Sequence, residues 1–133
     1  MTATESLWPT FSLEELERSP KTILKEQAVF FSKSTRNILT ATIRTSPYLG
    51  GTFEHEFKIV APQLNGYKYT LLTIHQKGVF SYPCSLYFED SSYDLSNEDE
   101  LLFRLREIFS SDLTKKIVSN LIAQSKDEVS DII

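Results

Sequence analysis

The chain has 133 residues, of which 41% are hydrophobic and 24% are charged, and its formal net charge is -4. This composition excludes a disordered chain, and the length suffices for a buried core, so we expect residues 1–133 to form a single domain. The 14 Lys and Arg residues are scattered along an acidic chain, so we expect no nucleic-acid partner.

Signals for a cellular compartment are few. The opening MTATESLWPTF lacks the basic region and apolar core of a secretory signal, and no apolar run approaches the roughly 20 residues that span a bilayer. The single cysteine, Cys84, forms no internal disulfide, which is typical of a reducing compartment. We therefore expect a cytoplasmic protein without a membrane partner.

The N-terminal segment predicts two helices and an apolar cluster before them. Ser12 and Glu15 have capping-box spacing, which predicts a short helix in SLEEL. Ser19 followed by Pro20 predicts the N-cap and first residue of a longer helix. The cluster at Trp8, in WPTF, has two interpretations: an anchor that folds the N-terminus onto the core, or a small exposed recognition patch. The sequence favours the anchor.

From residue 37 to residue 90 the pattern changes to a period of two, rich in Thr, Tyr, Phe, Ile and Val, which is typical of half-buried strands. Four strands are predicted, covering residues 37–45, 53–61, 66–76 and 79–89. The short segments between them carry turn residues, so the strands should form an antiparallel meander with 79–89 at an edge.

The C-terminal third returns to helical periodicity. Ser96 and Asp99 have capping-box spacing before ELLFRLREIF, and Ser110 or Ser111 precedes a last helix that runs toward VSDII. We therefore predict an α+β fold, in which a four-stranded antiparallel meander sheet carries the N-terminal and C-terminal helices on one face.

A two-residue turn at 77–78 would set the register of the last two strands. His75 then pairs with Phe80 and Leu71 with Cys84, which places Cys84 and His75 on one face about 13 Å apart. That separation is too large for a nucleophile and its base. Cys84 is expected in the core, as a small hydrophobe with a raised pKa.

The histidines are the candidates for a ligand pocket. In the predicted register His55 pairs with Thr73, which makes His75 its diagonal neighbour on the core face, with Tyr82 beside them. The candidate pocket consists of His55, His75, Tyr82 and Thr73. Because no Asp or Glu shares this face, we predict no metal site, no cofactor and no catalytic residue.

The opposite face of the predicted sheet is more apolar than a wetted face requires, and the segment EDSSYDLSNEDE adds negative charge that suits a basic partner. The predicted protein interface consists of Val60, Leu72, Ile74, Tyr87, Glu89, Asp90, Asp94 and Glu98.

Two functional hypotheses follow. The first is a small acidic bacterial protein that binds another protein, in an immunity- or chaperone-like role, or forms a homodimer through the outer sheet face or the edge strand 79–89. It fits a sequence without a phosphate loop, a nucleophile elbow or a zinc motif. The alternative is a small-molecule-binding protein or an enzyme with a pocket near His55, His75 and Tyr82.

Overall fold

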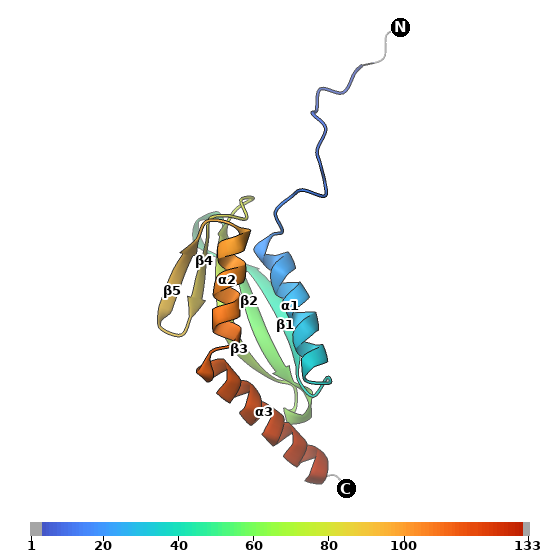
Figure 1. Ribbon diagram of the computed structural model, residues 1–133, viewed down its shortest axis with the longest axis vertical. Coiled ribbons are helices and arrows are strands. Elements are labelled where there is room, and N and C mark those ends of the chain that lie inside the picture. The colour runs from blue at the N-terminus through green and yellow to red at the C-terminus, as the bar shows by residue number, and fades with distance from the viewer. Residues whose placement is uncertain (1–3, 132–133) are drawn as a thin grey trace.

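The computed structural model describes residues 4–131 and confirms the α+β class, with an antiparallel sheet and helices at both ends of the chain (Figure 1). Its helices and strands are α1 (Pro20–Ser34), β1 (Thr40–Pro47), β2 (Thr52–Ala61), β3 (Tyr67–Lys77), β4 (Cys84–Phe88), β5 (Ser91–Leu95), α2 (Glu98–Phe109) and α3 (Asp112–Asp131). Short 3-10 turns, Leu49–Gly51 and Pro62–Leu64, lie on either side of β2. Ile132 and Ile133, the end of the predicted VSDII segment, lie outside the described residues.

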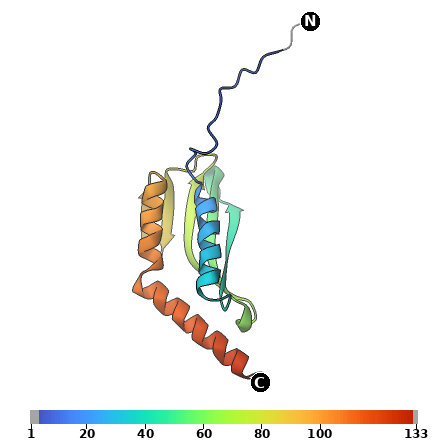
Figure 2. The same cartoon turned by 45° about the vertical axis from the view of Figure 1, so that its right-hand side comes forward.

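The fold has two layers. The five described strands form one antiparallel sheet in chain order, and all helices lie on one of its faces, as predicted (Figure 2). α1 and α2 run side by side, whereas α3 crosses obliquely beyond their C-terminal ends (Figure 1). The largest buried side chains between the layers include Ile23, Leu24, Leu39, Phe57, Ile59, Leu72, Ile74, Leu86 and Leu101.

α1 begins where the sequence predicts. Ser19 is its N-cap and accepts a hydrogen bond from the Thr22 N–H at 3.2 Å, and Pro20 occupies the first position. The predicted helix in SLEEL is wrong, because Ser12 begins only a single turn, closed by the Glu15 N–H at 3.3 Å. A helix that short has no stability without a packed face, and its leucines contact no core.

A bulge in β3 changes the predicted register of the sheet. Ile59 lies opposite Tyr69 as predicted, but Phe57 lies opposite Leu72, because β3 has one extra residue, Leu71. The shift exchanges the two faces for the rest of β3, so the predicted pairing of His55 with Thr73 is wrong. Leu71, Leu72 and Ile74 do not alternate, and the bulge is what buries all three.

The segment predicted as one edge strand is divided. Residues 78–83 form a loop, in which the Tyr82–Pro83 peptide is cis, and β4 starts only at Cys84, opposite Gln76. Pro83 has no N–H for a ladder, so the two-residue turn at 77–78 does not form. The chain turns again at Glu89 and adds β5, so the sheet has five described strands, and β5 rather than 79–89 is the edge.

The C-terminal helices are capped close to the predicted positions. Asn97, rather than Ser96, is the N-cap of α2, and its side chain accepts from the Glu100 N–H at 2.9 Å. Ser111 precedes α3 and accepts from the Thr114 N–H at 3.2 Å, as one of the two predicted alternatives. None of the helices within residues 4–131 is long and apolar enough to cross a membrane.

Candidate binding groove

The two histidines of the predicted pocket lie on opposite faces of the sheet, because the β3 bulge separates them. His55 faces the helices, is 4% exposed and uses both ring nitrogens. Its Nε2–H donates to Gln76 Oε1 at 3.1 Å, and its Nδ1 accepts from the Thr45 hydroxyl at 2.9 Å. Burial lowers the pKa of His55, which agrees with a neutral ring held by two neutral partners.

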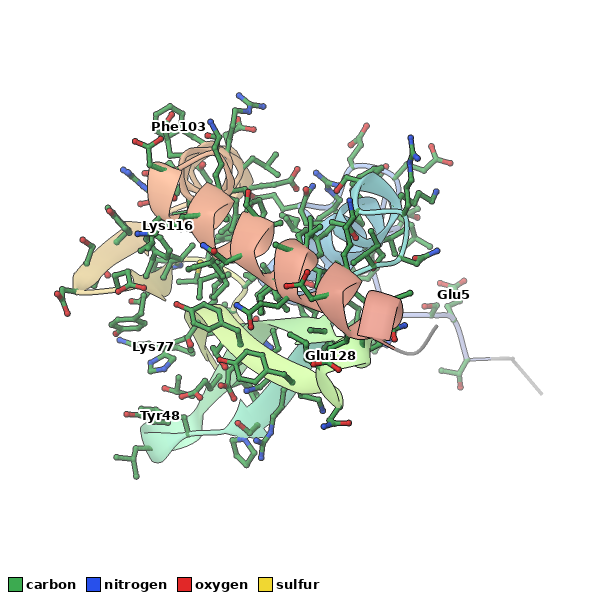
Figure 3. All side chains as sticks on the ribbon, turned by 90° about the horizontal axis from the view of Figure 1, so that it is seen from below. Glu5, Tyr48, Lys77, Phe103, Lys116 and Glu128 are labelled. Atoms are coloured by element: carbon green, nitrogen blue, oxygen red, sulfur yellow. The ribbon has the colours of Figure 1, made fainter. Side chains whose placement is uncertain are left out.

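His75 lies on the open face of the sheet, away from the helices. Its ring is between those of Tyr48 and Tyr87, with centroid distances of 4.5 and 4.7 Å, and its Nε2 lies 3.2 Å from Glu54 Oε2. Figure 3 shows Tyr48 at the edge of the sheet layer that is remote from the helices. His75 is therefore part of a surface aromatic stack with its own carboxylate partner.

The other two members of the predicted pocket are also apart. Thr73 lies on the open face, opposite Glu56 and Tyr87, and not on the core face opposite His55 as predicted. Tyr82 belongs to the loop 78–83, where its hydroxyl donates to the Arg18 carbonyl at 2.8 Å and burial raises its pKa. The structure thus distributes the four residues over the core, the open face and a loop.

Cys84 is a buried core residue, as predicted, although the reason differs. It lies opposite Gln76 and Leu95 on the helix-covered face, and burial raises the pKa of its thiol to about 11. His75 is on the other face, so the sheet itself, and not a 13 Å separation along one face, keeps the two apart.

The two central apolar residues of the predicted outer-face interface do not lie on that face. Leu72 and Ile74 are 2% and 0% exposed and pack in the core, again because of the bulge. Val60 and Tyr87 do lie on the open face, but their neighbours are polar. Lys58 exemplifies this, with its Nζ donating to Thr70 Oγ1 at 2.8 Å and 3.5 Å from a Glu56 carboxylate oxygen, Oε2.

The predicted acidic residues divide between surface and structural roles. Glu89 and Asp90 form the exposed β4–β5 turn, and Asp94 accepts from the Ser85 hydroxyl at 3.0 Å. Glu98 instead begins α2 and holds the chain just before α1, where its Oε1 accepts from the Arg18 N–H at 2.6 Å. Glu98 therefore links two helix ends.

An open apolar groove lies in the helix layer, where α3 diverges from α1. It encloses about 420 Å³, and its lining comes from the C-terminal half of α1, the end of α2, the first half of α3 and the sheet beneath. We call it the helix groove, and its lining residues are Gln27, Phe30, Phe31, Ser34, Phe57, Ile59, Leu71, Phe109, Thr114, Lys115, Val118 and Ser119.

The floor of the helix groove is built by the bulge and by an aromatic pair. Leu71, the extra residue of β3, faces the helices beside Ile59, and the rings of Phe57 and Phe109 lie 5.4 Å apart. Phe30 forms an exposed wall and leaves 61% of its surface to solvent. A groove with aromatic walls and a rigid sheet floor is suited to bind apolar side chains.

The helix groove continues into a crevice between α1 and α2. The crevice is lined by Gln27, Leu102, Leu105, Arg106, Phe109 and Ser110, so Gln27 and Phe109 belong to both spaces. The charged residues that line the two spaces are Arg106 and Lys115, and no carboxylate lines either. The apolar path is therefore basic, although the chain as a whole is acidic.

The sequence did not single out this groove, because the apolar residues that form it also fit a core helix or strand pattern. Phe31 and Phe109 fit the apolar stripes of their helices, and the direction of α3 leaves part of each side chain exposed. Phe30 carried the one signal, since a second phenylalanine beside Phe31 extends the apolar stripe onto a helix side that the sheet does not reach.

Comparisons with models of known families, with curated proteins and with solved structures each found no match. Within residues 4–131, no group of three or more His, Cys, Asp or Glu side chains is placed to hold a metal ion.

Proposed function

We propose that this protein is a non-catalytic binding module, and that the helix groove takes a segment of another polypeptide. The observation that carries the proposal is the open aromatic groove in a helix layer that is otherwise packed onto its sheet. Exposed apolar surface of this kind marks an interaction site in a soluble domain. An immunity- or chaperone-like role, in which the partner is held and not altered, fits this arrangement.

The lining specifies the chemistry of the partner segment. Phe30, Phe31 and Phe109 offer aromatic surface to large apolar side chains, which supply most of the binding energy in such grooves. Arg106 and Lys115 favour acidic residues beside those anchors. We therefore expect a segment with two or more large apolar side chains flanked by Asp or Glu.

A peptide selection on the purified full chain tests this proposal, with two neighbouring helix residues as a matched pair. Phe30 lines the helix groove, whereas Val29, also exposed, faces the other side of α1 toward β1. Selected peptides should carry acidic and large apolar residues and should bind Phe30→Ser about tenfold more weakly, a typical loss for one aromatic contact. Binding to Val29→Ser should be unchanged. Peptides that do not distinguish the two variants would contradict the proposal.

A small apolar molecule is the second candidate for the same space. The volume of about 420 Å³ lies within the range of ligand sites, and a few polar groups, such as Gln27 and Thr114, line it. This candidate replaces the predicted pocket near His55, His75 and Tyr82, whose residues are apart. Native mass spectrometry of the purified protein distinguishes the candidates, because a co-purified small molecule would appear as an added mass that Phe30→Ser loses.

A further inference from the structure

The segment before α1 is an arm that contacts little of its own domain. Residues 4–16 extend away from the two layers along the long axis of the molecule (Figures 1 and 2), and Glu5 on this arm lies clear of both layers (Figure 3). Trp8 is 79% exposed, so the predicted anchor onto the core is not formed. The large apolar side chains exposed along the arm are Leu7, Trp8, Phe11, Leu13 and Leu16.

The root of the arm is fixed, and it directs the arm away from the domain's own groove. The Arg18 guanidinium contacts the carboxylates of Glu26 and Glu98, and the Glu17 carboxylate accepts from the Glu98 N–H at 2.9 Å. These contacts lie at the N-terminal end of α1. Phe30, on the groove wall, is ten positions beyond Pro20, which is about 15 Å along the helix.

The arm and the groove are complementary in charge and in apolar character. The acidic residues of the arm are Glu5, Glu14 and Glu15, and along the chain they lie on either side of its run of large apolar residues, Leu7, Trp8, Phe11 and Leu13. The path formed by the groove and the crevice is apolar and carries Arg106 and Lys115 without a carboxylate. The arm thus has the large apolar and acidic side chains that the proposed function requires of a partner segment. The inference below rests on that proposed function.

We infer that the arm of a second copy of this chain occupies the helix groove, so that two copies exchange arms. An exchange of this kind has twofold symmetry, in which each copy gives one arm and receives one, and both exposed apolar surfaces become covered. The arm is long enough to reach into the groove of a second copy, because residues 5–16 in an extended conformation span about 40 Å at the usual rise per residue. Trp8 and Phe11 are the anchors, and Arg106 and Lys115 receive the acidic residues.

The single tryptophan makes the inference measurable on the unmodified full chain. Light scattering should give twice the 15.3 kDa chain mass, and the emission of Trp8 should shift to the blue. Both signals should disappear together on dilution. A blue shift that persists in a monomer would show the arm in its own groove and overturn the inference. A solvent-like emission at every concentration would overturn it as well.

Two matched pairs of variants locate the contact. Lys115→Glu should weaken the dimer about tenfold, whereas Lys116→Glu, on the side of α3 that faces Tyr67 and Tyr69, should not. Phe11→Ser should also weaken the dimer, whereas Val79→Ser, which removes a more exposed apolar side chain in the loop 78–83, should not. Equal effects within either pair would overturn the inference.

A complementation experiment separates this inference from the proposed function. Phe11→Ser removes an anchor of the arm and Phe30→Ser removes a wall of the groove, so a mixture should form heterodimers in which one intact arm meets one intact groove. If selected peptides bind the groove but the mixture stays monomeric, the arm exchange is wrong and the proposed function stands. If Phe30→Ser affects neither peptides nor dimer, both are wrong.

Discussion

The two faces of the sheet differ in how their side chains are arranged toward solvent. On the open face, side chains pair with one another: His75 stacks between Tyr48 and Tyr87, and Lys58 bridges to Thr70 and Glu56. On the covered face, helices bury the apolar residues of the sheet, and the aromatic surface that stays open belongs to the helices, chiefly to Phe30 at the helix groove. The sequence predicted a protein interface on the open face, whereas the structure exposes apolar surface among the helices.

The largest expected effect comes from two adjacent residues of β3 that the bulge assigns to different faces. Leu72→Asp places a carboxylate in the core and should destabilise the fold by about 4 kcal/mol or more. Thr73→Asp places the same group on the open face and should change the free energy of unfolding by less than about 1 kcal/mol. Denaturant titration measures both. An uninterrupted strand would reverse this order.

The helix groove provides the second test, because its floor belongs to the core whereas its wall is exposed. Phe57→Ala removes a side chain that is 2% exposed and its contact with Phe109, and should cost about 3–4 kcal/mol. Phe30→Ser, on the exposed wall, should cost less than about 1 kcal/mol. If urea midpoints show equal losses for the two, the wall is not an open surface, and the comparison of the two faces fails at the groove.

These two pairs of variants concern the bulge and the helix groove, two features of the fold that the sequence did not predict. Caps and apolar periodicity predicted α1, α2 and α3, and the turn residues predicted the antiparallel order and the start of the β2–β3 register, because each of these depends on neighbouring residues. The bulge depends instead on whether Leu71, Leu72 and Ile74 all find space beneath the helices, which local spacing does not contain. The groove depends on the direction in which α3 leaves α2, and that direction follows from packing of the whole layer.

The histidines give a third test, in which pH distinguishes the faces. Burial lowers the pKa of His55 below 6.5, so below pH 6.5 the unfolded chain binds a proton at this residue more readily than the folded chain. The contribution of His55 to the free energy of unfolding is therefore fully present above pH 6.5, and it is lost as the pH drops through the lower folded-state pKa. His55→Gln should reduce this loss in urea titrations between pH 7 and pH 5. The matched variant His75→Gln should retain the His55 contribution, and a profile unchanged in His55→Gln would contradict the assignment.

The smallest effect is expected on the open face, and it separates the two candidate dimer surfaces. Tyr87→Ser removes one side of the stack on His75 and should cost about 1 kcal/mol, since a single aromatic contact contributes about this much. Because the open face pairs its own side chains, the same variant should leave the dimer measured by light scattering unchanged, in contrast to Phe30→Ser. A dimer lost in Tyr87→Ser and kept in Phe30→Ser would return the interface to the sheet face that the sequence favoured. The two variants each remove one exposed aromatic ring, so any difference between them reports which face the second copy contacts.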